Sequence, residues 1–162
     1  GGELPEEDNR HDYEPRSLHE VLDDTNVVVP LKEIEKDPLS LGTADGGAMR
    51  FSIVRVDDTN RDQLTEKNQY TKAFDYDKSK GALILSTAQP DDEIRISVGT
   101  KTIRRFFIDQ KISRDERENV LVLKDMEGVL WIIGYRIGVP YMITDQTTKA
   151  LVVEIIGEEN EN

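Results

Sequence analysis

The arginines and lysines between positions 101 and 117 are the residues best suited to a chemical role. Residues 95–117 hold seven bases and three acids, in a chain of 162 residues whose formal net charge is -12. Arginine and lysine bind phosphate through point charge and, for arginine, bidentate hydrogen bonds. The segment KTIRRFFIDQKISRDER is therefore a candidate phosphate-binding surface, although lysine and arginine also solvate ordinary helices. Its basic residues are Lys101, Arg104, Arg105, Lys111, Arg114 and Arg117.

Other polar sets give weaker signals. The glycine-rich segment 42–47 is followed by no helix pattern that would supply amides to a phosphate, so a hairpin turn is preferred. Acids at 57–58 and 91–93 offer oxygen ligands for a divalent cation, but acids in turns are usually only solvated. Four tyrosines can stack on bases, although tyrosines in strands more often pack with the hydroxyl toward water: Tyr70, Tyr76, Tyr135 and Tyr141.

Composition excludes several classes of protein. Cysteine is absent, and the two histidines, His11 and His19, lie in the polar N-terminal region, so no thiolate or histidine-rich metal site and no Ser-His-Asp triad is expected. No P-loop or dinucleotide fingerprint occurs, and no apolar run approaches the length of a membrane span. The acidic total argues against indiscriminate nucleic-acid binding, but it permits binding through one local basic face.

The elements that position the basic segment predict an α+β fold, in which a mixed or antiparallel sheet carries a short basic helix-turn-helix unit. Ile103, Phe106 and Phe107 fall at helical spacing, which predicts a helix over 100–109 with one buried face. Ser113 and Glu116 match a capping box at the start of a second helix. Apolar and alternating runs predict strands, and the stretch 57–72 is expected to be a loop with at most a short helix. The expected strands lie near residues 27–29, 51–56, 82–85, 94–98, 120–124, 129–133 and 151–156.

Charge and composition divide the chain into four segments. Residues 1–17 are polar and interrupted by proline, so we expect a flexible lead-in. Residues 18–72 read as a small strand-rich segment, residues 73–157 as a C-terminal domain for substrate recognition, and 158–162 as an acidic tail. The glycines at positions 1 and 2, with no methionine ahead of them, indicate a fragment of a larger protein.

The run from Phe74 to Ile156 resembles the C-terminal region of bacterial tRNA(Ile)-lysidine synthetase. The resemblance rests on the ordered pattern K-x-x-x-x-F-F-I-D-x-K-I-x-R-x-x-R, which starts at Lys101, followed by W-I-x-G-Y-R-I, which starts at Trp131. The segment from Val28 to Asn68 is similar only loosely to what precedes that region in the family.

The resemblance implies the part of a ligase that recognises tRNA and is not catalytic alone. The family joins lysine to the wobble cytidine of an isoleucine tRNA with a CAU anticodon, using ATP and Mg²⁺ in an N-terminal catalytic domain whose S-G-G-x-D-S loop is absent here. The implied partners are that tRNA and the catalytic domain, and no membrane is implied. The resemblance also implies no cofactor in this chain and a cytoplasmic location. The implied phosphate contacts are the six bases above and Arg136, while Ile103, Phe106, Phe107, Ile112 and Trp131 are expected in the core.

The sequence departs from the family pattern between Leu85 and Glu93, where several expected bases are missing and acids stand at 91–93. Ser113 and Leu121 also stand where the family often has proline. Losing phosphate contacts removes electrostatic affinity, so a second hypothesis stays open. In that alternative the domain docks on its own catalytic domain or on a partner without binding RNA, and the basic segment pairs with carboxylates. The sequence leaves enzyme activity, oligomeric state and strand order open.

Overall fold

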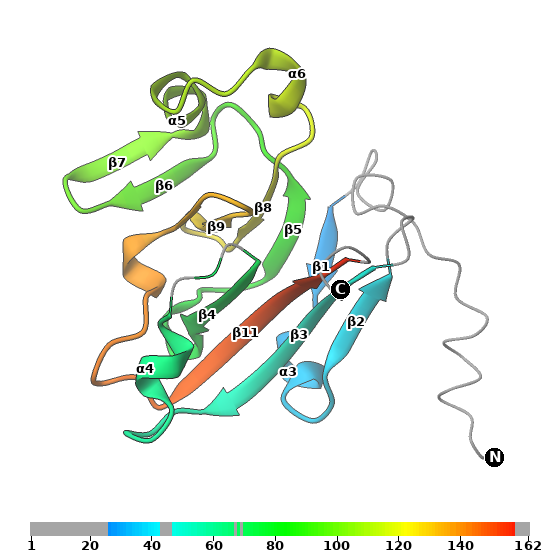
Figure 1. The fold of residues 1–162 in the computed structure, drawn as a ribbon, viewed down its shortest axis with the longest axis vertical. Coiled ribbons are helices and arrows are strands. Elements are labelled where there is room, and N and C mark those ends of the chain that lie inside the picture. Colours follow the sequence, from blue (N-terminus) through cyan, green and yellow to red (C-terminus); the bar gives the residue numbers. More distant parts are fainter. Residues whose placement is uncertain (1–25, 43–46, 67, 69, 158–162) are drawn as a thin grey trace.

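The computed structural model describes residues 26–42, 47–66, 68 and 70–157, which form three antiparallel sheets and several short helices (Figure 1). The expected α+β fold is confirmed. The expected lead-in at 1–17, the acidic tail at 158–162, both histidines and most of the glycine-rich segment lie outside the described residues.

A five-stranded sheet forms the central layer, in the order β1-β5-β8-β9-β10. Successive residues of β8 face opposite sides: Leu121 and Leu123 enter one buried cluster, whereas Val122 enters another. The sheet is therefore covered on both faces. Its strands are β1 (Val27–Val29), β5 (Leu83–Thr87), β8 (Leu121–Lys124), β9 (Val129–Ile132) and β10 (Arg136–Ile137).

A four-stranded sheet packs against one face of the central sheet, in the order β2-β3-β11-β4. Its long last strand pairs on one side with β3 and on the other with β4. Residues from both sides of the expected boundary at 72/73 thus share one sheet, and the division into domains stays a prediction. The strands are β2 (Leu39–Gly42), β3 (Ala48–Arg55), β4 (Thr71–Asp75) and β11 (Lys149–Ile156).

A two-stranded sheet and the two helices of the basic segment lie together at one end of the molecule, at the top of Figure 1. The hairpin is β6 (Glu93–Ile96) and β7 (Gly99–Thr102), followed by α5 (Ile103–Asp109) and α6 (Arg114–Arg117). The remaining helical turns are α3 (Leu31–Ile34), α4 (Arg61–Leu64), η1 (Tyr76–Lys78) and η2 (Val139–Tyr141).

Two main hydrophobic clusters flank the central sheet. The first joins it to the four-stranded sheet and contains Trp131 and Phe74, whose ring centroids are 5.9 Å apart. The second joins its other face to α5, and Ile103, Phe106 and Phe107 are all buried in it. Burying one large apolar side chain contributes about 1.5–3 kcal/mol, so the second cluster fixes the position of α5 on the sheet.

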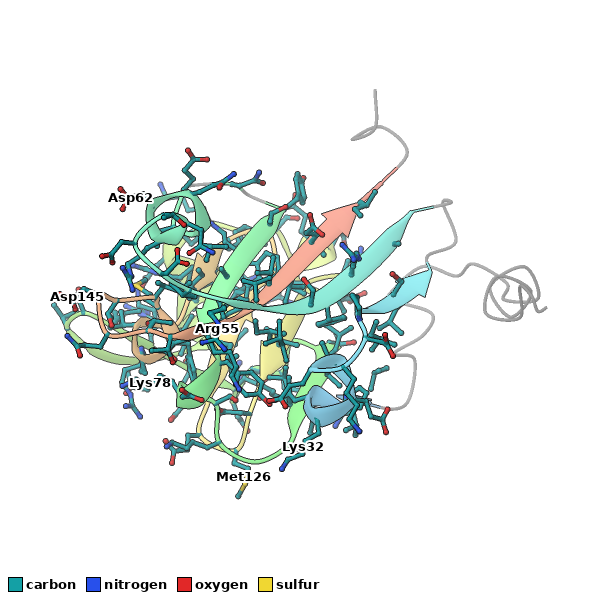
Figure 2. All side chains as sticks on the ribbon, turned by 90° about the horizontal axis from the view of Figure 1, so that it is seen from below. Lys32, Arg55, Asp62, Lys78, Met126 and Asp145 are labelled. Atoms are coloured by element: carbon teal, nitrogen blue, oxygen red, sulfur yellow. The ribbon has the colours of Figure 1, made fainter. Side chains whose placement is uncertain are left out.

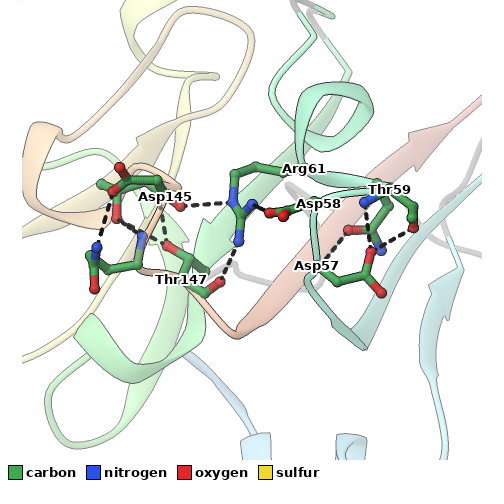
Figure 3. Close-up of polar contacts among 9 residues, drawn as sticks. Asp57, Asp58, Thr59, Arg61, Asp145 and Thr147 are labelled. Atoms are coloured by element: carbon green, nitrogen blue, oxygen red, sulfur yellow. Dashed lines mark hydrogen bonds and ion pairs between the residues drawn. The ribbon is translucent and has the colours of Figure 1, made fainter.

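A third, smaller cluster lies on the outer face of the four-stranded sheet, where α4 and the loop after Met142 cover it. Arg61 on α4 connects this helix to the loop after Met142. Its guanidinium donates to the carbonyls of Thr144 at 3.1 Å and Thr147 at 3.3 Å and pairs with Asp58 at 2.6 Å (Figure 3). The Thr147 hydroxyl in turn donates to the buried carboxylate of Asp75 at 2.7 Å. This network connects α4 and the loop after Met142 to β4 at the edge of the sheet, and Asp58 takes part in it through its ion pair with Arg61.

Two expectations for secondary structure were wrong. The helix expected over 100–109 begins only at Ile103, because 99–102 pair with β6 as a strand. Gly99 has a φ of 132° and forms the turn between β6 and β7. Thr100 and Thr102 are β-branched and therefore favour a strand. The second error is β4, which begins at Thr71 within the stretch expected as a loop.

Candidate nucleic-acid interface

The helix α5 has clear end signals. The Thr102 hydroxyl accepts from the backbone N–H of Arg105 at 3.2 Å, which caps the first turn. At the other end, the N–H of Lys111 donates to the carbonyl of Ile108, and the N–H of Ile112 to the carbonyl of Phe107, the pattern of a Schellman motif. Lys111 has a φ of 57° in this motif, at a position that favours glycine.

The helix α6 confirms the capping box expected at Ser113. The Ser113 hydroxyl accepts from the N–H of Glu116 at 3.2 Å, and the Glu116 carboxylate accepts from the N–H of Ser113 at 3.4 Å. The helix is one turn long, and Arg117 holds it against α5. The Arg117 Nε donates to the carbonyl of Ile112 at 2.8 Å, and its guanidinium carbon lies 5.6 Å from the Phe107 ring centroid.

Two of the expected phosphate contacts are instead engaged by Asp109. The Nζ of Lys101 lies 2.7 Å from its Oδ2, and the Nε of Arg105 lies 3.5 Å from its Oδ1. The hydrogen bond from Lys101 and the two positive charges lower the pKa of the Asp109 carboxyl, so it is ionised at neutral pH. Lys101 and Arg105 are therefore partly neutralised within the domain.

Four basic residues between 103 and 117 have no acidic partner among the residues that the structure describes, and one of them, Arg117, is half-buried and held by the Ile112 carbonyl. Arg104, Lys111 and Arg114 are all exposed, and none of them takes part in an ion pair there. Arg104 lies in the first turn of α5, Lys111 follows the C-cap of that helix, and Arg114 begins α6. This distribution concentrates unpaired positive charge on the α5–α6 unit, which we define as residues 103–117.

Arg136 and Arg95 lie outside that unit. Arg136 is exposed on β10, where it lines a separate groove of about 320 Å³ with Leu64 and Met142. Arg95 was not among the expected contacts, although it belongs to the basic window. It is exposed on β6 opposite Thr100, whereas Lys101 stands opposite Ile94, so the two bases face opposite sides of the hairpin. Alternation of Arg95 with Ile94 and Ile96 was the sequence signal for this exposure.

Three of the acids weighed as cation ligands, Asp57, Asp58 and Asp92, have structural partners. The Asp57 carboxylate accepts from the N–H and hydroxyl of Thr59, which caps the turn before α4. Asp92 accepts from the N–H of Gln89 at 2.9 Å and pairs with Lys124 at 2.9 Å. Within the described ranges, no three histidine, aspartate or glutamate side chains are grouped so that they could hold a metal ion.

The tyrosines weighed as stacking platforms are differently placed. Tyr141 is buried, and its hydroxyl donates to the Asp125 carboxylate at 2.9 Å. The Tyr76 ring faces the Nζ of Lys149 at 5.1 Å, and burial together with the Glu35 carboxylate raises the pKa of Tyr76 to about 12. Tyr135 meets the Phe106 ring edge-on at a centroid distance of 5.8 Å, and only Tyr70 and Tyr135 of the four are exposed.

Two stacked antiparallel sheets with a capped, basic pair of helices at one end define a small α+β domain. A similar arrangement is seen in the crystal structure of a TilS C-terminal domain, with a TM-score of 0.56 over 74% of this chain and 91% of that chain. Sequence identity to that structure is 18%, so this likeness supports the fold.

Residues 83–154 match the model of the TilS substrate C-terminal domain. The chain is 34% identical over 142 residues to the tRNA(Ile)-lysidine synthase of Caldanaerobacter subterraneus subsp. tengcongensis, and 32% identical over 83 residues to that of Clostridioides difficile. This region therefore belongs to the tRNA(Ile)-lysidine synthase family and corresponds to its C-terminal part, as the sequence resemblance indicated.

The matched part of the chain spans only a fraction of these relatives. The match covers 83% of this chain but 28% of the Caldanaerobacter protein, and 51% of this chain but 18% of the Clostridioides protein. Among the residues that the structure describes, no helix has the length and apolar character required to cross a membrane.

Proposed function

We propose that this chain is the tRNA-binding part of a tRNA(Ile)-lysidine synthase and that the α5–α6 unit grips the RNA backbone. The observation that carries the proposal is a set of exposed basic residues in a chain of net charge -12 that pair with no acid among the described residues: Arg104, Lys111 and Arg114. Phosphate contacts of this kind position RNA without reading its sequence.

In this proposal the chain positions the tRNA relative to the catalytic domain of the parent ligase. The parent ligase attaches lysine to the wobble cytidine of isoleucine tRNA in the cytoplasm, and ATP and Mg²⁺ belong to its catalytic domain. The described residues do not fit that metal, since they contain no suitable cluster of acids or histidines. By holding the tRNA body, the α5–α6 unit raises the effective concentration of the cytidine at the catalytic domain.

One observation supports the alternative of a docking domain. Asp109 already neutralises Lys101 and Arg105 in part, which shows that the basic segment accepts carboxylate partners. In that alternative the exposed bases meet acids of the catalytic domain, and RNA affinity is absent.

The test is binding of the chain to unmodified isoleucine tRNA at several salt concentrations. RNA contact predicts affinity that falls steeply with salt, with a slope that becomes shallower by about one for each phosphate-binding base removed. The double variant Lys111→Glu/Arg114→Glu should therefore bind more weakly and with a shallower salt dependence than the unaltered chain.

The matched control is Lys32→Glu/Lys36→Glu. It makes the same change in net charge at α3 and the turn that follows it. The helix α3 lies at the opposite end of the molecule from α5 and α6 (Figure 1), and Lys32 points outward from the ribbon (Figure 2). Equal loss of affinity in both double variants would contradict an interface on the α5–α6 unit. Absence of binding at low salt would favour the docking alternative.

A further inference from the structure

A groove of about 360 Å³ opens between the end of β5 and the two helices of the α5–α6 unit. This volume lies near the lower end of the ~300–1,000 Å³ usual for small-molecule sites, so a double helix cannot enter it. Its surface is mostly apolar, and two arginines and one glutamate are among the residues that border it. The residues that line it are Thr87, Ala88, Pro90, Arg104, Phe107, Arg117 and Glu118.

Arg117 provides a fixed flat surface in this groove. Its Nε is held by the Ile112 carbonyl at 2.8 Å, and its guanidinium packs over the Phe107 ring at 5.6 Å. Phe107 also lines the groove but is only 5% exposed, so little of its ring is open to a ligand. Unpaired RNA bases stack on arginine planes as well as on aromatic rings, and a plane already held in place loses little entropy on binding.

Arg104 and Glu118 give the groove a polarity. The backbone N–H of Arg104 donates to the Pro90 carbonyl at 3.2 Å, while its exposed guanidinium forms no ion pair with any described residue and is available to a phosphate. The Glu118 carboxylate repels phosphate but accepts hydrogen bonds from the exocyclic amino group of a base. The groove is thus bordered by a cationic group suited to a phosphate and by an acceptor suited to an amino group.

We infer that this groove binds one unpaired nucleotide whose base carries an exocyclic amino group. The inference rests on the proposed function and deepens it. The exposed basic residues of the α5–α6 unit contact the backbone of paired RNA, and the groove binds a nucleobase that is unstacked from the RNA helix. Stacking of one base is worth about five-fold to a hundred-fold in affinity.

The experiment compares two RNA hairpins that differ by a single unpaired cytidine, using fluorescence anisotropy with the full chain. We expect the hairpin with the unpaired cytidine to bind about ten-fold more tightly. Arg104→Gln should abolish that difference. Arg105→Gln is the matched control, because it removes the same charge from the neighbouring residue of α5, which does not line the groove. It should lower both affinities and preserve their ratio.

A second comparison replaces the unpaired cytidine by uridine, which has a carbonyl in place of the amino group. We expect about a five-fold preference for cytidine, reduced below about two-fold in Glu118→Ala. Equal binding of paired and unpaired hairpins by the unaltered chain, or equal loss of the ratio in Arg104→Gln and Arg105→Gln, would overturn the groove and leave the proposed function standing. Failure to bind either hairpin would overturn both.

Discussion

The Nζ of Lys101 on β7 donates to the Oδ2 of Asp109 at the end of α5, over a distance of 2.7 Å. The same carboxylate also faces the Nε of Arg105 at 3.5 Å. One acid thus ties the hairpin to the helix and partly offsets two positive charges. The strength of the proposed interface should therefore depend on Asp109 as well as on the basic residues.

Removing the Asp109 charge should strengthen RNA binding. In Asp109→Asn the ammonium of Lys101 and the guanidinium of Arg105 lose their counter-charge, and we expect affinity for tRNA at low salt to rise about three-fold with a steeper salt dependence. The control Asp115→Asn makes the same charge change at an exposed acid of α6 that forms no ion pair with the described residues. A rise of the same size in both variants would show that only net charge matters.

Lys111 should lower the stability of the fold while it contributes a positive charge to RNA binding. Its φ of 57° costs a residue with a side chain about 1 kcal/mol relative to glycine, so Lys111→Gly should increase the free energy of unfolding by about that amount in urea denaturation. RNA affinity should fall, because a phosphate contact is lost. Lys111→Ala separates the two effects, since it removes the charge and keeps the strained backbone. Stabilisation by alanine equal to that by glycine would contradict this account.

Much of the fold could be predicted because short-range patterns decide it. The capping box at Ser113 and the buried face of Ile103, Phe106 and Phe107 depend on neighbours within four residues, and each was confirmed. The start of α5 could not be predicted in this way. Helical spacing continues back to Thr100, but pairing with β6 across the turn at Gly99 overrides it, and strand pairing is a tertiary event.

The candidate site shows the same division. Sequence identified which residues carry positive charge, and the structure shows which of those charges are available. The pair Lys101–Asp109 spans eight residues and forms because a strand turns directly into a helix, a geometry that no local pattern reveals. Arg136 lies in a different groove for a related reason, because the path of β10 is set by its pairing with β9.

The α5 core can be tested by truncation of one ring. Phe107 is 5% exposed, so Phe107→Ala should lower the free energy of unfolding by about 3–5 kcal/mol, through lost burial and the cavity left behind. Ile108, the next residue, is 46% exposed, and Ile108→Ala should cost less than about 1 kcal/mol. Urea denaturation of both variants checks the expectation. A loss below about 1 kcal/mol for Phe107→Ala would mean that the helix presents a different face to the sheet.

The hydroxyl of Tyr141 should make stability sensitive to alkaline pH. Burial and the neighbouring Asp125 carboxylate raise the pKa of Tyr141, so the folded chain favours the protonated phenol more than the unfolded chain does. The resulting stabilisation is complete below about pH 10, the ordinary tyrosine value, and is lost as pH rises from there through the folded pKa. The free energy of unfolding should therefore decline above about pH 10, and the decline should be shallower in Tyr141→Phe.

At neutral pH the same variant loses the hydrogen bond to Asp125, which also accepts from the N–H groups of Glu127 and Gly128. We expect Tyr141→Phe to cost about 1.5–3 kcal/mol there, as for other hydrogen bonds to charged groups. Tyr70→Phe, at an exposed ring, should change the neutral value by less than about 0.5 kcal/mol. Urea denaturation across pH 7–11 measures both effects, and parallel pH profiles for the unaltered chain and Tyr141→Phe would contradict the assignment, because the alkaline loss would then come from other groups.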